Sequence, residues 1–166
     1  MGIRSLDCTS GEFAEVGSDF LRAGISLRFS ARGASMRPLV RDGDVLFVEP
    51  VDASGISVGD VVLCRDSNGR VLVHRVIRRS KDRSNTRFLI HGDQVSRPDG
   101  WFTADQVLGR VSSFERDRVH VDMRQPALRF LGSLAVLRSR MHLVNGLFCY
   151  ASPLLKHLPL FSNYLT

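Results

Sequence analysis

The chain has no long hydrophobic run. In its 166 residues no window of 18 consecutive residues is wholly apolar, as a typical membrane-spanning helix would require. The first ten residues also lack the apolar stretch of a secretory signal peptide. We therefore expect a protein that lies in the cytoplasm or is attached peripherally to a membrane.

Cysteine is scarce, and its spacing fits no known framework. Cys8, Cys64 and Cys149 are odd in number and far apart, which favours reduced, buried thiols over disulfides or zinc ligands. The histidines other than His74 show no metal-ligand spacing and are expected at the surface or in packing: His91, His120, His142 and His157. We predict neither a metal nor a cofactor.

Acidic residues are absent after Asp122, although basic residues continue to Lys156. Much of the net charge of +6 therefore falls in the last quarter of the chain, which is also rich in Leu and Phe. A basic, apolar segment fits an anionic membrane surface or a docking protein better than it fits nucleic acid.

The length suits one domain with three segments. Phe13, Val16 and Phe20 recur at helical spacing before Gly24, so residues 10–23 are predicted to form a helix within an N-terminal segment, 1–24. Residues 25–122 are predicted to form a β-rich core. Residues 123–166 are predicted to form a basic, helical tail, which either packs on the core as a helical hairpin or contacts a membrane surface.

Alternating or apolar runs bounded by turn residues predict the strands of the core. They lie at residues 26–32, 45–49, 61–64, 70–77, 88–90, 107–111 and 119–121. The polar stretch 78–85 is predicted to be a loop or hairpin tip, and the stretch around Pro98 and Gly100 a loop. Many short strands with helices only at the ends indicate a mainly β fold, a compact barrel or sandwich.

The segment 33–38 is suited to presenting a nucleophile. Gly33 and Ala34 leave the hydroxyl of Ser35 without steric cover, Met36 offers an apolar anchor, and Pro38 stiffens the chain that follows. Taken alone, Ser35 is more simply explained as an ordinary turn residue.

A histidine on a predicted strand supplies the matching base. His74 lies in a run rich in Val and Ile, where a core histidine is the simpler explanation. Together, a serine on a tight turn and an imidazole on a rigid strand are what nucleophilic catalysis requires. The only lysines are Lys81, in the polar stretch, and Lys156, in the tail.

The order of motifs resembles the signal peptidase I family of S24/S26 serine peptidases over about residues 25–112. The motifs run Gly-Ala-Ser-Met-Arg-Pro (33–38), Asp-Gly-Asp-Val (42–45), Val-Gly-Asp-Val-Val (58–62), Val-His-Arg-Val-Ile (73–77), His-Gly-Asp (91–93) and Leu-Gly-Arg-Val (108–111). The resemblance implies the β-barrel core shared by signal peptidases and LexA. Histidine at position 74, where bacterial members commonly carry lysine, resembles the endoplasmic-reticulum and archaeal type.

The base also needs an acceptor for its second ring nitrogen. Asp93 and Asp99 both follow the neighbouring predicted strand, and the resemblance favours Asp99, with Asp93 as the alternative acid. Asp44 and Asp60 are expected to cap backbone turns.

Two features depart from the family pattern. A serine that commonly assists the oxyanion hole is replaced by Gly33, so the hole would rest on the backbone of residues 33–35, with Met36 and Pro38 positioning the substrate. No N-terminal membrane anchor is visible, which puts secretory preproteins in doubt as substrates.

The sequence thus predicts a serine endopeptidase that cleaves a leader or targeting segment from a precursor peptide or protein. Ser35 would be the nucleophile, His74 the general base and an aspartate its orienting group. The alternative is a weakly active or inactive peptide-binding or regulatory module on the same fold.

Overall fold

The computed structural model describes residues 10–82, 85–126, 128–129 and 132–141. In chain order the elements are α1 (Ser10–Arg22), β1 (Leu27–Ser30), β2 (Val45–Glu49), η1 (Ala53–Gly55), β3 (Val61–Arg65), β4 (Val71–Asp82), β5 (Asn85–His91), β6 (Gly100–Thr103), η2 (Ala104–Gln106), β7 (Val107–Arg116) and β8 (Val119–Asp122). The protein is mainly β, as the sequence predicts.

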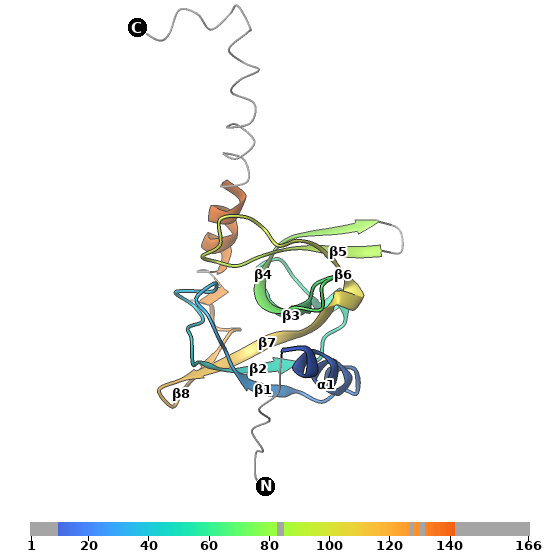
Figure 1. Cartoon of the computed structure of the whole chain (residues 1–166). Helices are drawn as coiled ribbons and strands as arrows, with labels where there is room; N and C mark the ends of the chain where they lie inside the picture. The colour runs from blue at the N-terminus through green and yellow to red at the C-terminus, as the bar shows by residue number, and fades with distance from the viewer. Residues whose placement is uncertain (1–9, 83–84, 127, 130–131, 142–166) are drawn as a thin grey trace, which may run out of the picture.

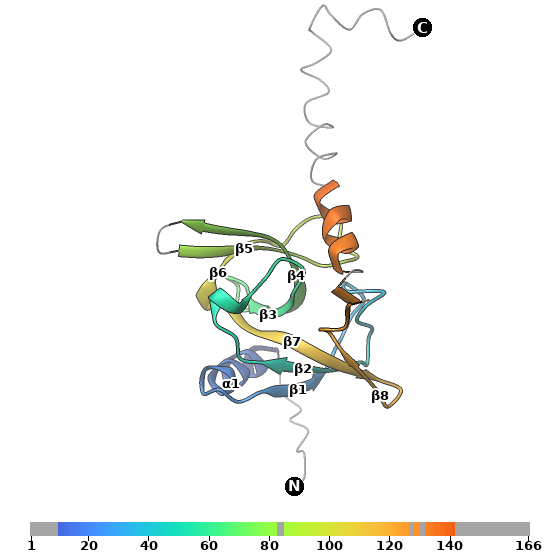
Figure 2. The same ribbon diagram turned by 180° about the vertical axis from the view of Figure 1, so that it is seen from behind.

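The strands form one antiparallel sheet that curls into a half-barrel (Figure 1). Its order is β1-β2-β7-β3-β4-β5-β6, and β8 pairs with β7 outside this path. The central strand β7 carries both β2 and β3, so it joins the two halves of the curled sheet. Helix α1 lies beside β1 and β2 at one end in both views (Figures 1 and 2).

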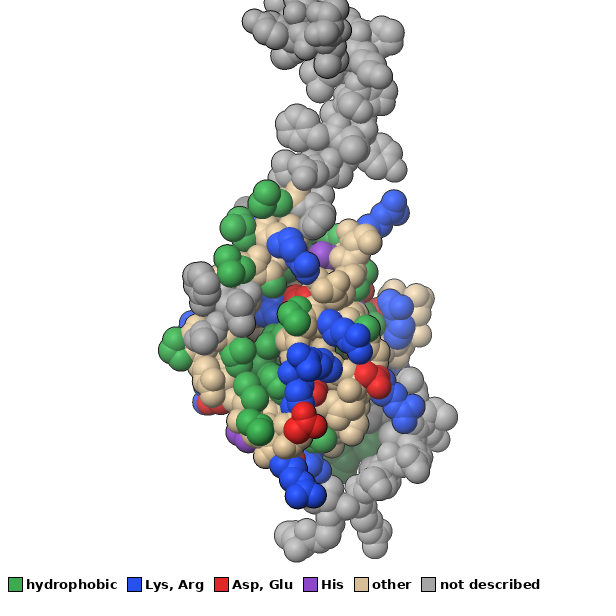
Figure 3. All heavy atoms as spheres, turned by 90° about the vertical axis from the view of Figure 1, so that its left-hand side faces the viewer, with side chains coloured by type: hydrophobic (Ala, Val, Ile, Leu, Met, Phe, Trp, Pro, Cys, Tyr) green, Lys and Arg blue, Asp and Glu red, His purple; other side chains and the backbone are tan. Residues whose placement is uncertain are grey.

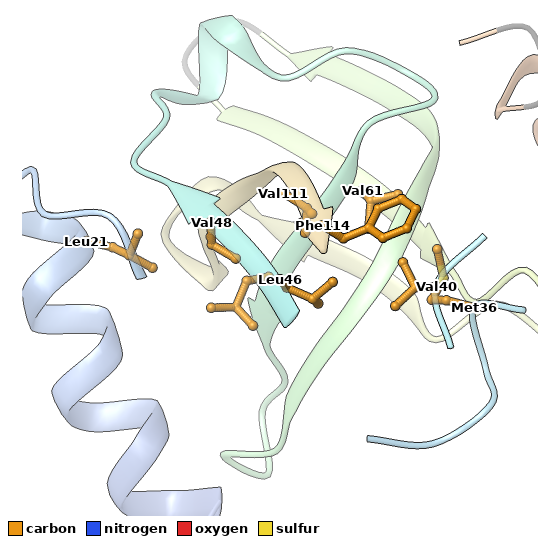
Figure 4. Packing of buried hydrophobic residues seen from close by; sticks show 9 residues of the cluster. Leu21, Met36, Val40, Leu46, Val48, Val61, Val111 and Phe114 are labelled. Carbon is orange, nitrogen blue, oxygen red and sulfur yellow. The ribbon is translucent and has the colours of Figure 1, made fainter. Parts of the chain in front are cut away.

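The curl encloses two groups of buried apolar side chains. The larger one joins α1, the segment after β1, and strands β2, β3 and β7 (Figure 4). Its buried members are Leu21, Met36, Val40, Leu46, Val48, Val61, Leu63, Val111 and Phe114. The second group packs Phe88 and Ile90 of β5 against β3, β4 and β6.

Two predictions about the strands were wrong. Residues 78–82, predicted as a loop or hairpin tip, extend β4 and pair with β5, although all five side chains are polar. A strand was also missed at β6, where Trp101 and Phe102 pair with β5. In both places ladder hydrogen bonds with a neighbouring strand override the local polar and turn signals.

A helical segment, residues 132–141, packs on the opposite end from α1 (orange in Figures 1 and 2). Val136 and Ser139 are buried, whereas Leu134, Leu137 and Met141 are exposed. Within the described residues, no helix has the length and apolar character to span a bilayer. Most of the predicted basic tail, residues 142–166, lies outside the described part of the chain.

Candidate active site

The segment after β1 holds Ser35 in a braced turn. Gly33 has a φ of +95°, a conformation that glycine adopts without strain, and its N–H donates to Asp42 Oδ1 at 2.7 Å. Met36 and Val40 are each only 4% exposed and lie side by side in the core (Figure 4). Ser35 itself stays partly exposed, so the loop is anchored on both sides of an accessible hydroxyl.

Ser35, His74 and Asp99 are brought together in one hydrogen-bonded chain. The distance from Ser35 Oγ to His74 Nε2 is 2.8 Å, and that from His74 Nδ1 to Asp99 Oδ2 is 2.7 Å. These distances fit a neutral imidazole whose Nδ1–H donates to the carboxylate while Nε2 accepts the serine O–H. The His74 and Asp99 side chains are 7% and 12% exposed. The arrangement is that of a nucleophile, a base and an orienting acid.

Strand geometry separates the two candidate acids. Successive side chains of β4 point to opposite faces of the sheet, so His74 and Arg75 have different partners. Arg75 forms two hydrogen bonds with the Asp93 carboxylate, at 2.8 and 2.7 Å, and also donates to the carbonyl of Gly59 at 2.7 Å. The structure therefore places Asp99 on His74 and pairs Asp93 with a buried arginine.

The turn between β5 and β6 forms one wall of the site. The N–H of Gln94 donates to the carbonyl of Ser35 at 2.7 Å. A Cβ on Gly92 would lie 2.9 Å from His74 Nε2 and 3.1 Å from the carbonyl oxygen of Ser35. A larger residue at position 92 would crowd the His74 imidazole and the backbone of Ser35, which explains the glycine there. Neither Gly92 nor Gln94 is among the site residues that the sequence predicts.

The other predicted residues have structural positions. Asp44 accepts the N–H of Arg41 and Asp60 accepts that of Ser57, as predicted for turn-capping carboxylates. Met36 is buried and can affect a substrate only through the loop that it anchors, whereas Pro38 is exposed. The N–H of Gly33 is occupied by Asp42, so it braces the turn and is not free to bind an oxyanion.

The free cysteine of the described residues, Cys64, does not compete with Ser35 as a nucleophile. Burial raises the pKa of the Cys64 thiol far above its ordinary range, which leaves it protonated and inert. Cys8 and Cys149 lie outside the described residues. Among the residues that the structure describes, no three His, Cys, Asp or Glu side chains gather as metal ligands.

His91 is buried beneath the same turn, not exposed at the surface. Its Nε2 donates to the carbonyl of Val95 at 2.8 Å, whereas Nδ1 is buried with no hydrogen-bond partner among the described residues. Burial lowers the pKa of His91 below its ordinary value of 6.5, because a positive charge on the ring would be poorly solvated there.

We expect this histidine to make folding sensitive to acid. The unfolded chain binds a proton at His91 more readily than the folded chain, so the free energy of unfolding falls as the pH drops below about 6.5. It stops falling from this cause below the lowered pKa of the folded protein. His91→Gln keeps an N–H donor for Val95 but cannot titrate. Urea unfolding at pH 7.5 and 5 should show a smaller loss in the variant, and an equal loss in both proteins would contradict the assignment.

Comparison with models of protein families gives no match, and comparison with curated proteins gives none of significance. The resemblance to signal peptidases therefore depends on the order of the sequence motifs.

Proposed function

We propose that the protein is a serine endopeptidase of the signal-peptidase type, with a half-barrel core of that family. The observation that carries the proposal is the continuous chain from Ser35 Oγ through His74 to Asp99, with hydrogen bonds of 2.8 and 2.7 Å. A turn serine and a core histidine without catalytic roles have no need of this alignment. The buried acid behind the ring adds a cost that a purely structural histidine does not require.

The proposed reaction begins when Ser35 Oγ attacks a peptide carbonyl carbon and His74 Nε2 takes the hydroxyl proton. Asp99 stabilises the imidazolium that forms. The tetrahedral intermediate then collapses, the C–N bond breaks, and His74 gives its proton to the leaving amine. A water molecule, activated by His74 in the same way, hydrolyses the acyl-serine and releases the second product.

The oxyanion donor in this scheme is the backbone N–H of Ser35. Within the described residues this N–H donates to no acceptor, whereas the N–H of Gly33 is taken by Asp42. A preorganised N–H aimed at the developing negative charge stabilises the transition state at no reorganisation cost.

Two strand edges could receive an extended substrate. In the described sheet β1 is terminal, and the chain runs from its end directly to Ser35. The first part of β4, up to His74, pairs with β3 on one side only, because pairing with β5 begins at Arg75. Main-chain hydrogen bonds to such edges would hold a peptide in β-augmentation, with its scissile bond beside Ser35.

The substrate we propose is a precursor peptide or protein that carries a leader or targeting segment. The basic tail would dock on a membrane surface or a protein partner. On the face of the molecule shown in Figure 3, basic side chains lie among hydrophobic ones, with fewer acidic ones between them.

The test is modification by a fluorophosphonate probe, followed by peptide mapping. We expect the probe to label Ser35, because His74 Nε2 accepts the hydroxyl proton as Oγ attacks. Cys64 and the other serines should stay unmodified. If the folded protein reacts no faster than the unfolded one, the chain is instead a peptide-binding module without turnover.

A further inference from the structure

The helical segment 132–141 contacts the strand that carries the base. Gly132 is buried, and a Cβ there would lie 3.0 Å from Arg75 Nη1, so the helix closely approaches the guanidinium of Arg75, the residue after His74 on β4. Val136 and Ser139 follow at helical spacing and are 7% and 3% exposed. One face of this segment is therefore packed on the barrel beside the candidate site.

Two arginines of the segment reach backbone carbonyls of the barrel. Arg138 Nη2 donates to the carbonyl oxygen of Asp93. Arg140 donates through Nε and Nη2 to the carbonyl oxygen of Ile77, at 3.2 and 3.0 Å. Both arginine residues are exposed, and both place a charged donor on a neutral carbonyl. Of the two acceptors, only the carbonyl of Asp93 is linked to Ser35.

The link runs through a single peptide group. The carbonyl that accepts from Arg138 and the N–H that donates to Ser35 belong to the same peptide bond, Asp93–Gln94. A cationic donor on the carbonyl polarises the peptide and strengthens the hydrogen bond that its N–H makes. The Arg75 pair holds the side chain of Asp93 at the same time, so this peptide is fixed from two sides.

We propose that Arg138 is a positioning residue for Ser35, acting through the Asp93–Gln94 peptide on the carbonyl of the nucleophile. The role rests on the proposed peptidase function for its effect on rate. The positioning itself is a property of the folded chain and can be measured without turnover. Arg140 makes the same kind of contact on the same helix, at a carbonyl with no connection to Ser35, and serves as the matched control.

The experiment compares Arg138→Gln with Arg140→Gln in the full chain, since both remove one positive charge and one guanidinium. For Arg138→Gln we expect probe labelling of Ser35, and kcat on any peptide that is cleaved, to fall about three- to thirtyfold with KM nearly unchanged. Arg138→Lys, which keeps a charged donor, should recover part of the rate. For Arg140→Gln the change should stay below about twofold.

Hydrogen exchange at the Gln94 amide gives a second readout that needs no activity. Exchange should be faster in Arg138→Gln than in the wild type, and unchanged in Arg140→Gln, with similar thermal unfolding in all three proteins. If the wild type does not react with the probe but exchange changes as expected, the peptidase function fails while the positioning holds. Equal effects of the two variants, or a change in only one readout of an active wild type, would overturn the proposal.

Discussion

Replacing Ser35 by alanine is expected to abolish probe labelling and to lower peptide cleavage by about four to six orders of magnitude. In the proposed mechanism the hydroxyl oxygen of Ser35 forms the acyl bond, and its removal leaves His74 without a group to deprotonate. Because Ser35 is partly exposed and its neighbours Met36 and Val40 hold the loop, the free energy of unfolding should hardly change. Ser67→Ala, at an exposed serine in the turn between β3 and β4, is the matched control.

The base should show the same dependence. His74→Ala is expected to cost nearly as much activity as Ser35→Ala, and the double variant little more than either single one, because the two residues act as one unit. Cleavage should be measured together with urea unfolding, since removing a buried ring also leaves a cavity. Additive losses in the double variant would mean that the hydroxyl and the imidazole act independently, and the proposed mechanism would fail.

Much of the arrangement could be predicted from sequence, because the relevant signals are local. The alternation of Leu27 and Phe29 with polar residues predicts β1, and the Asn68-Gly69 turn joins β3 to β4. The sequence predicts Ser35 and His74 as a pair of nucleophile and base, because one lies in a tight turn and the other on a strand. Their meeting, 39 residues apart in sequence, is a result of the curled sheet.

The remainder depends on contacts that no local signal reports. The choice between Asp93 and Asp99 is decided by the opposite directions of His74 and Arg75 on β4, together with the course of the turn that follows β5. Likewise, the sequence alone indicates only that Gly92 is a turn glycine. Its contact with both Ser35 and His74 is seen only in the structure. The sequence does offer one pointer to Gly92. It follows His91, the residue at which strand β5 ends beside β4, close to His74.

The docking of segment 132–141 is one of two interpretations left open by the sequence. Its spacing is compatible with a helix packed on the barrel or with membrane contact, and the arginines at 138 and 140 do not choose between them. Their actual acceptors are backbone carbonyls, which have no sequence signature at all.

Removing either partner of the Arg75–Asp93 pair is expected to destabilise the fold by about 3–5 kcal/mol. The two side chains are 3% and 5% exposed, so each single variant leaves a buried charge without its counter-charge. Arg75→Ala should cost at least as much as Asp93→Ala, since it also removes the donor to the Gly59 carbonyl. The double variant should lose clearly less than the sum of the single losses, as urea unfolding would show.

The half-buried pair of Arg110 and Glu49 provides the comparison. Its side chains are 28% and 27% exposed, and Glu49→Gln should cost only about 0–1 kcal/mol. A similar loss in the free energy of unfolding at the two pairs would contradict a buried ion pair. Additive losses in the Arg75 and Asp93 double variant would contradict coupling between the two side chains. The Asp93 variant should also lose cleavage rate beyond its loss of folded protein. Its carboxylate holds the peptide whose N–H bonds to the Ser35 carbonyl, so a destabilised fold and a displaced nucleophile have one cause.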